Sequence, residues 1–318
     1  MKHTFVMIQT QPGPDDEENM REIIRLIHEA AALYQPELIL LPETCAWDYS
    51  AAADASGRDP LSDRAAGPDS PFILSLRKLA AKYGTWLVSG ILEKAVIPGE
   101  AGGSGKAVDP EKTGEPGKAV IPEKTGSAGG AEDGRCYNTV LVINDAGDIV
   151  TAYRKTHLYD AFESRESDLF LPGDSLFDPV DTPFGRIGVF VCYELRFPEV
   201  ARSQRARGAD ILLVPSAWVR GEMKSEHFRT LVMARAIENT AYVLACNKSG
   251  NTAMGESLAV DPMGVVTAYA GRTAERRADE RAEAAGGKII PVTVDTDRIT
   301  QVRRILPSFE ERRPELYG

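Results

Sequence analysis

Three residues with complementary chemistry, Glu43, Lys155 and Cys192, each stand at or near the end of an apolar or alternating run. Cys192 follows the run IGVFV, and a polar turn with a helix start comes after it. A strand that ends this way presents its thiol at the rim of a sheet, where the thiol can attack a substrate. A carboxylate can take the thiol proton, and a lysine ammonium can hold the oxyanion formed when a carbonyl is attacked. The set predicts a cysteine acyl-transfer enzyme that works without histidine.

Each of these residues also has a simpler interpretation when it is taken alone. A lone cysteine is more often a small buried hydrophobe, and an isolated lysine or glutamate more often lies on the solvated surface. His157 offers a rival mechanism, because it lies two residues after Lys155 and a Cys–His pair would indicate a cysteine peptidase or transferase. The strand-end positions of all three residues favour the Glu–Lys–Cys interpretation.

The elements that must position these residues are short buried strands. Glu43 follows four apolar residues, 38–41, and Pro42 cannot continue as a paired central strand. Alternating apolar and polar residues from 149 onward predict a strand that ends near Lys155. Ligands of open α/β sheets gather outside the carboxyl ends of the strands. We therefore expect Glu43, Lys155 and Cys192 to converge at one edge.

Along the rest of the chain, predicted strands and helices alternate. One helix places Met20, Ile23, Ile24, Ile27 and Ala31 on one face. A second is predicted from the Ser70-Pro71 cap to Gly84, a third from Pro198 and a fourth over 226–239. Further strands are predicted over 3–9, 85–92, 187–191, 210–216, 242–247, 257–260, 265–269 and 289–294. Strands interleaved with helices indicate an α/β fold built in layers.

The strings LPET around Glu43, YRKTHLYD around Lys155 and CYELRFPE around Cys192 occur in this order along the chain. In these strings and their order the sequence resembles a known family, the nitrilase superfamily of carbon-nitrogen hydrolases. NTVLVIN, PFGRIGVFVCYELRFPEVAR, MARAIENTAYVLACNKSG and SLAVDPMGVV extend the resemblance over nearly the whole chain except residues 95–135. It implies a four-layer αββα sandwich and an assembly of homodimers or higher homo-oligomers. The mechanism predicted for Glu43, Lys155 and Cys192 needs no metal or organic cofactor.

The resemblance implies a second glutamate shortly after the lysine. Glu166 and Glu163 are the candidates, and the spacing back from the LPGD turn at 171–174 favours Glu166, which would position Lys155. The resemblance also implies that His157 is structural. CYELRFPE is most similar to the ω-amidase-like branch, although Glu194 stands where that branch usually has Asp.

That branch cleaves small amides that carry a carboxylate, such as ω-amides of 2-oxo or dicarboxylic acids, and releases ammonia. We expect Tyr193, Trp218 and Arg220 to bind the substrate, with the Tyr193 N–H helping to hold the oxyanion. Arg196 and Lys224 are further candidate cations, and we expect Arg196 to form a structural ion pair. A nitrilase, an N-carbamoyl hydrolase and a catalytically silent scaffold remain as alternatives.

Composition limits the partners and the compartment. The 318 residues carry a net charge of -10, with a pI near 5.1. This acidity argues against nucleic acid and anionic membranes as partners. The expected ligand is the small-molecule amide that the resemblance implies. The four cysteines show no CxxC or metal spacing, which is typical of a reducing cytoplasm. No run approaches the ~20 apolar residues of a membrane helix.

A repeated segment interrupts the pattern over residues 94–134. Three twelve-residue units begin at Lys94, Lys106 and Lys118 with KAVIPGEAGGSG, KAVDPEKTGEPG and KAVIPEKTGSAG. Their Gly, Pro, Lys and Glu content cannot bury enough apolar surface to offset the entropy of ordering. We predict a flexible insertion, or else a partner-binding arm, within a single carbon-nitrogen hydrolase domain over 1–318.

Overall fold

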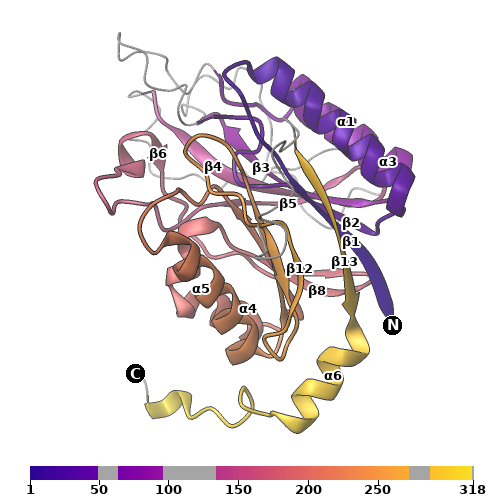
Figure 1. Cartoon of the computed structure of the whole chain (residues 1–318), viewed down its shortest axis with the longest axis vertical. Helices are drawn as coiled ribbons and strands as arrows, with labels where there is room; N and C mark the ends of the chain where they lie inside the picture. The colour runs from indigo at the N-terminus through magenta and orange to yellow at the C-terminus, as the bar shows by residue number, and fades with distance from the viewer. Residues whose placement is uncertain (49–63, 96–133, 272–286, 317–318) are drawn as a thin grey trace, which may run out of the picture.

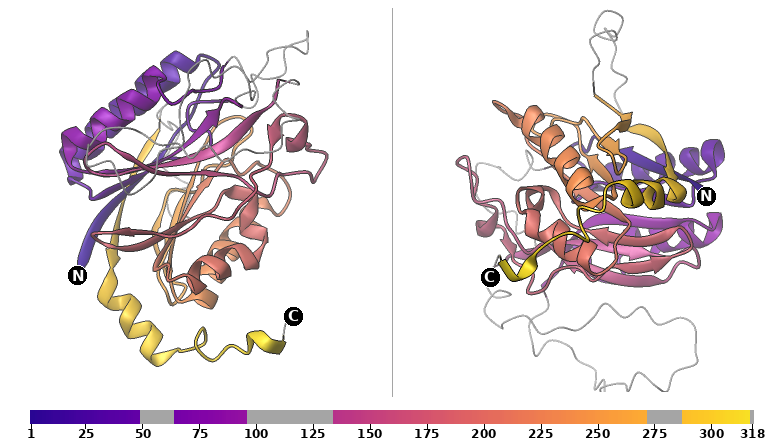
Figure 2. Two further views of the ribbon diagram at one scale, coloured as in Figure 1. Left: turned by 180° about the vertical axis from the view of Figure 1, so that it is seen from behind. Right: turned by 90° about the horizontal axis from the view of Figure 1, so that it is seen from below.

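Two β-sheets lie face to face, and helices cover the outer face of each (Figures 1 and 2). The computed structural model describes residues 1–48, 64–95, 134–271 and 287–316. Within these ranges the first sheet has the strand order β13-β1-β2-β3-β4-β5, with β6 pairing β4. The second sheet has the order β12-β11-β10-β9-β8-β7. Helices α1 and α3 cover the first sheet, and α4 and α5 cover the second, giving the four-layer αββα sandwich that the sequence predicts (Figure 1).

The strands of the first sheet are β1 Lys2–Gln9, β2 Leu38–Leu40, β3 Trp86–Glu93, β4 Cys136–Ile143, β5 Ile149–Arg154, β6 Phe170–Leu171 and β13 Lys288–Asp295. Those of the second are β7 Val180–Thr182, β8 Gly185–Val189, β9 Ile211–Ser216, β10 Tyr242–Asn247, β11 Leu258–Val260 and β12 Val266–Tyr269. The helices are α1 Asp16–Tyr34, α3 Pro71–Tyr83, α4 Pro198–Ala206, α5 Lys224–Asn239 and α6 Thr296–Ile305. The 3-10 helices in the described ranges include η3 Glu166–Asp168, η4 Cys192–Arg196 and η6 Pro314–Leu316.

Alternating residues of β1 divide the core into two parts. Phe5 and Met7 belong to the cluster between the two sheets, whereas Val6 and Ile8 belong to the cluster beneath α1 and α3. Successive side chains of a strand point to opposite faces, so a strand that is buried on both faces is apolar at every position. This accounts for the continuous apolar run of β1.

Local signals set the ends of α3 as the sequence predicts. The Ser70 hydroxyl accepts a hydrogen bond from the Ile73 N–H at 3.4 Å, and Pro71 occupies the first turn, where it has no hydrogen bond to lose. Gly84 ends the helix with φ of 59°, a left-handed conformation that glycine adopts at little cost. The helix therefore holds Phe72 and Leu76 against the first sheet.

Strand direction brings the chemically important strand ends to one edge. β2 runs parallel to β1 and β3, and β5 runs in the same direction because two antiparallel pairings separate it from β3. In the second sheet β8, β9 and β10 are parallel to one another. The segments that follow β2, β5, β8 and β9 therefore carry the residues of the site described below.

Most predicted element boundaries lie within one residue of the observed ones, and two elements differ by two residues. β8 spans Gly185–Val189 and not 187–191, and α5 begins at Lys224, two residues before the predicted start. Of the predicted insertion, residues 96–133 lie outside the described part of the chain, and the flanking strands β3 and β4 are antiparallel neighbours. Among the described residues, no helix combines the length and apolarity that crossing a membrane requires.

Candidate active site

Glu43 lies just beyond β2 in a segment that passes very close to β3. The Gly90 N–H donates to the Pro42 carbonyl at 3.1 Å, and the Cys45 N–H donates to the Gly90 carbonyl at 3.1 Å. A Cβ atom at Gly90 would lie 2.4 Å from the Pro42 oxygen and 2.6 Å from the Glu43 Cα. Glycine at position 90 is therefore needed for Glu43 to reach its place.

Lys155 follows the last residue of β5 and is almost fully buried. Its N–H donates to the Asn138 carbonyl at 2.9 Å, so the chain still pairs with β4 at this point. Its carbonyl accepts from the Gly173 N–H at 2.8 Å, and a side chain at Gly173 would clash with the backbone of Arg154. The lysine side chain is 2 % exposed, and its Nζ reaches Glu43 and Glu166.

Cys192 occupies the first position of η4, two residues after Phe190 leaves the second sheet. Its φ is 47°, in the left-handed region that a residue with a Cβ rarely adopts. The turn is closed by the Glu194 N–H, which donates to the Val191 carbonyl at 2.9 Å. The strand-to-turn arrangement expected for a nucleophile is therefore present, with a strained backbone at the thiol-bearing residue.

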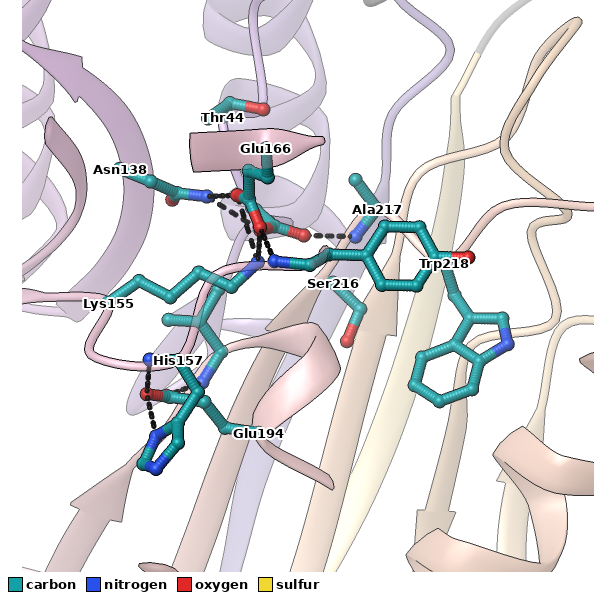
Figure 3. Close-up of polar contacts among 12 residues, drawn as sticks. Thr44, Asn138, Lys155, His157, Glu166, Glu194, Ser216, Ala217 and Trp218 are labelled. Atoms are coloured by element: carbon teal, nitrogen blue, oxygen red, sulfur yellow. Dashed lines mark hydrogen bonds and ion pairs between the residues drawn. The ribbon is translucent and has the colours of Figure 1, made fainter. Parts of the chain in front are cut away.

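Two carboxylates, one ammonium and one amide form a buried network (Figure 3). Lys155 Nζ donates to Glu43 at 2.9 Å and to the two oxygens of Glu166 at 2.8 and 3.0 Å. Asn138 Nδ2 donates to Glu43 at 2.6 Å and to Glu166 at 3.1 Å. The Ala217 N–H, just after β9, donates to the second oxygen of Glu43 at 2.7 Å. The network joins residues from both sheets.

The charges of this network act on Glu43 and Cys192 in opposite directions. Burial alone would raise the pKa of the Glu43 carboxyl, but Lys155, Lys248 and Asn138 together hold that pKa below its usual value. Burial and the Glu43 carboxylate raise the pKa of the Cys192 thiol well above its usual value, despite the opposing effect of Lys155. At neutral pH the site therefore pairs an ionised carboxylate with a protonated thiol.

The other glutamate and histidine candidates take different places. Glu166 is buried against Lys155, whereas Glu163 is exposed at the rim of the pocket. The His157 ring stacks on Phe197 with centroids 4.2 Å apart. Its Nδ1 lies 3.4 Å from a carboxylate oxygen of Glu194, and the ring is not among the groups that line the pocket. Of the two glutamates, only Glu166 joins the network.

A pocket of about 400 Å³ opens from this network to the surface. Its inner end is formed by Glu43, Lys155, Glu166 and Cys192, and its walls include Tyr193 and Trp218 as the sequence analysis expected. Within the described residues, no group of three or more His, Cys, Asp or Glu side chains is arranged to hold a metal ion. The pocket can hold a small organic molecule with its reacting group against the thiol.

The pocket's cations differ from those expected. Arg220 is exposed, donates to the Gly250 carbonyl at 3.2 Å and does not line the pocket. The expectation that Arg196 forms a structural ion pair is wrong. Arg196 lines the pocket with its guanidinium 4.8 Å from the Trp218 ring, and its buried Nε and Nη2 atoms have no hydrogen-bond partner among the described residues. Lys224 also lines the pocket and donates to the Tyr159 hydroxyl at 2.7 Å.

Three polar groups of the site were not found by sequence reasoning. Asn138 was visible only as a polar residue in an otherwise apolar strand, the NTVLVIN of β4. The Ala217 N–H is a backbone group and leaves no trace in residue type. Lys248 donates to the Thr44 carbonyl at 3.2 Å and to its hydroxyl at 2.9 Å, and burial lowers its pKa to about 8. A lysine directly after the apolar strand β10 was the available signal.

The layered fold and the Glu–Lys–Cys geometry define a hydrolase that uses a cysteine to cleave carbon-nitrogen bonds, and the comparisons with known proteins agree. A profile of the carbon-nitrogen hydrolase family matches residues 7–304. The chain is 34% identical to the deaminated glutathione amidase of Bos taurus, over 98% of this chain and 82% of that one. It belongs to the carbon-nitrogen hydrolase family.

Two further comparisons place the chain among amidases and nitrilase-superfamily structures. It is 39% identical to the deaminated glutathione amidase of Escherichia coli O157:H7, over 57% of this chain and 63% of that one. The crystal structure of Saccharomyces cerevisiae Nit3, a member of branch 10 of the nitrilase superfamily, superposes with a TM-score of 0.71 at 25% identity. That superposition covers 98% of this chain and 97% of Nit3. The fold and the enzyme class expected from the sequence are confirmed.

Proposed function

We propose that this protein hydrolyses a small amide that carries a carboxylate, through a thioester on Cys192, and releases ammonia. The observation that carries the proposal is the joint geometry of the pocket. Its inner end holds a protonated thiol beside an ionised carboxylate and an ammonium. Its wall holds a buried guanidinium edge with no partner among the described residues. The first arrangement suits acyl transfer, and the second suits an anion.

In the first half of the proposed reaction, Glu43 takes the thiol proton of Cys192 as the sulfur attacks the amide carbon. The low pKa of Glu43 means that the base is ready, and the raised pKa of Cys192 means that the proton stays until attack begins. Lys155 and the Tyr193 N–H stabilise the oxyanion. Glu43 then gives its proton to the leaving nitrogen, and ammonia departs from the thioester.

In the second half, Glu43 takes a proton from a water molecule that attacks the thioester carbon. The carbon–sulfur bond then breaks, Glu43 gives this proton to the sulfur, and the carboxylic acid product leaves with the thiol of Cys192 and the Glu43 carboxylate restored. Glu166 contributes by holding Lys155, whose ammonium lies within 3.0 Å of both Glu166 oxygens. This ion pair fixes the position of the ammonium while the substrate's charge changes.

Arg196 is the residue we propose for the substrate carboxylate, in place of Arg220. The Nε and Nη2 atoms form one edge of the guanidinium, and this edge matches the two oxygens of a carboxylate. A buried donor without a partner is costly, so these atoms favour a ligand that supplies acceptors. Lys224 adds a second positive charge to the same wall.

The names of the relatives support an amide substrate that carries a carboxylate. The relatives from Escherichia coli and Bos taurus described above are named deaminated glutathione amidases. Nit3 of Saccharomyces cerevisiae is named an omega-amidase. Each name is consistent with an amide of a 2-oxo or dicarboxylic acid, which is the class that the Arg196 wall favours. We propose this class for the present chain, with nitriles and N-carbamoyl compounds as the alternatives.

Ammonia release from a panel of compounds tests the proposal. The panel contains ω-amides of 2-oxo and dicarboxylic acids, neutral amides of matched length, a nitrile and an N-carbamoyl amino acid. We expect the carboxylate-bearing amides to give the highest kcat/KM. Preference for the nitrile or the N-carbamoyl compound would reassign the branch, and no turnover of any compound would favour the silent scaffold.

We also propose that the chain acts in the cytoplasm as a homodimer or a higher homo-oligomer, as a single domain with the 94–134 insertion. Cys45, Cys136, Cys192 and Cys246 are all unpaired in the described structure, which fits a reducing compartment. Light scattering of the purified full chain measures the mass directly. A monomer mass at micromolar concentration would overturn the oligomeric proposal.

A further inference from the structure

Glu194, two residues after the nucleophile, has more polar contacts than its place in a turn requires. It is fully buried, at 0% exposure, and its two carboxylate oxygens contact different parts of the chain. Oε2 accepts from the Val191 N–H at 2.7 Å, within the turn that carries Cys192. Oε1 lies toward the segment around Lys155 (Figure 3). The carboxylate therefore spans two segments that are about forty positions apart in the sequence.

The contacts on the lysine side are numerous and short. Oε1 accepts from the Tyr153 hydroxyl at 2.7 Å, the Thr156 N–H at 3.0 Å and the Thr156 hydroxyl at 2.7 Å. The His157 N–H also donates to it, at 3.3 Å. Tyr153 precedes Lys155 by two residues and Thr156 follows it directly. The position of the lysine backbone is thus fixed from both sides by one oxygen.

The contact on the nucleophile side supports a strained turn. Cys192 has φ of 47°, so the Val191–Glu194 turn holds a cysteine in a conformation that it rarely adopts. The turn is closed twice, by the Glu194 N–H on the Val191 carbonyl and by Oε2 on the Val191 N–H. Without the second bond a less strained conformation, with the thiol turned away from Glu43, becomes accessible.

We infer that Glu194 is a positioning residue that sets the distance between the nucleophile and the oxyanion-holding lysine by bonding one carboxylate oxygen to each segment. The inference rests on the proposed function, since it assumes that Cys192 and Lys155 act on the same substrate carbonyl. His157 then helps to hold the Glu194 carboxylate in place. Its N–H and ring Nδ1 both contact Oε1 of Glu194, and the residue does not line the pocket.

Glu194→Gln is the main test, because it keeps the size of the side chain and removes one acceptor and the charge. We expect kcat to fall about 100-fold with KM changed less than about threefold, since a small misplacement of reacting groups lowers the rate of chemistry and not binding. Glu194→Asp keeps the charge on a shorter arm. We expect kcat to be at least about tenfold higher than in Glu194→Gln, because the negative charge and both acceptor oxygens are kept.

Asp261→Asn is the matched control. Asp261 is also a buried carboxylate that accepts backbone N–H bonds in a turn, from Met263 and Val265 at 2.8 and 2.9 Å. It follows β11 at the end of the second sheet away from the pocket. We expect Asp261→Asn to lower Tm and to leave kcat within about twofold of the wild type. A fall in kcat equal to that of Glu194→Gln would overturn the inference.

Alkylation of Cys192 by iodoacetamide, located by peptide mapping, gives a readout that needs no substrate. Loss of a nearby negative charge would by itself favour the thiolate, so slower alkylation in Glu194→Gln would report misplacement of the thiol. We expect a rate at least about fivefold lower. A wild type that releases no ammonia would sink the proposed function and leave this measurement valid. If folded Glu194→Gln is alkylated at the wild-type rate and keeps the wild-type kcat, the inference about Glu194 is wrong while the proposed function stands.

Tyr153→Phe covers the case in which Glu194→Gln does not fold. It removes one donor on the lysine side and leaves the nucleophile turn intact. We expect kcat to fall by about fivefold to tenfold with KM unchanged. Unchanged kcat in a folded Tyr153→Phe protein would contradict the bridging role.

Discussion

The inner end and the outer wall of the pocket handle charge in opposite ways. At the inner end, the Lys155 ammonium is shared between two carboxylates, and Asn138 also donates to both of them. On the outer wall, Arg196 and Lys224 form no ion pair with any described residue. The buried Nε and Nη2 donors of Arg196 have no hydrogen-bond partner among the described residues, which is costly, so an anion bound there would stabilise the wall. The charged groups that carry out the reaction are therefore paired within the protein, whereas the free donors of Arg196 are left to bind the carboxylate of the proposed substrate.

Removing the base at the inner end of the pocket should have the largest effect on activity. Glu43→Gln keeps the shape but cannot accept the thiol proton, so we expect kcat to fall by about 10³-fold or more. Steady-state ammonia release at saturating substrate measures it. His157→Asn is the control and should lose far less activity, because its ring contacts Glu194 and not the pocket. An equal collapse in both variants would show that histidine is the base.

Removing the guanidinium from the outer wall should affect binding selectively. For Arg196→Met we expect kcat/KM to fall about 100-fold for a carboxylate-bearing amide, because a charge-assisted hydrogen-bond pair is lost. The matched neutral amide should change by less than about threefold, and Arg196→Lys should recover part of the loss. The ratio of kcat/KM for the two substrates is the measurement. An equal loss for both would place Arg196 in the structure of the site and not in recognition.

The pH profile of kcat/KM tests the protonation states of Glu43 and Cys192 at the inner end of the pocket. Activity requires an ionised Glu43 and a thiol that still carries its proton. The pKa of Glu43 lies below its usual 4.5 and that of Cys192 well above its usual 9.0. As pH falls, activity is lost only as Glu43 is protonated, so kcat/KM should stay level from about pH 5.5 up to about pH 7.5, below the pKa of about 8 of Lys248. A midpoint near pH 6.5 in the acid limb would indicate a titrating imidazole instead.

The smallest effect is expected at Arg220, which the sequence placed in the pocket and the structure does not. Arg220→Ala should leave kcat/KM for the carboxylate-bearing amide within about twofold, because an exposed arginine contributes little. The same assay as for Arg196→Met measures it. A loss as large as that of Arg196→Met would restore the sequence prediction and would show that the arginine reaches the substrate during turnover.

The sequence predicted the fold well because its signals are local and strong. The apolar runs of β1, β3, β9 and β10 and the cap residues of α3 each act within a few positions. α5 was predicted to begin two residues late because its first residue follows Met223, which is in a left-handed conformation and supplies no side-chain cap. A start of that kind has no signature in residue type.

The site was predicted less completely because part of it is set by tertiary contacts. Strand ends predicted the places of Glu43, Lys155 and Cys192. The role of Arg196 was predicted wrongly because it depends on how η4 folds. The 3-10 turn places Arg196 near Cys192, and it also brings the guanidinium over Trp218, which follows β9. The Ala217 N–H could not be predicted, since it depends on backbone direction after β9.

The most direct test of the account is the mass of the acyl-enzyme. The protein is mixed with a carboxylate-bearing amide, quenched in acid within the first turnovers and analysed by intact mass and peptide mapping. We predict an added acyl group on Cys192, labile to hydroxylamine and absent in Cys192→Ala, together with one equivalent of ammonia. A Cys192→Ala protein that turns over the amide at the wild-type rate would contradict the account.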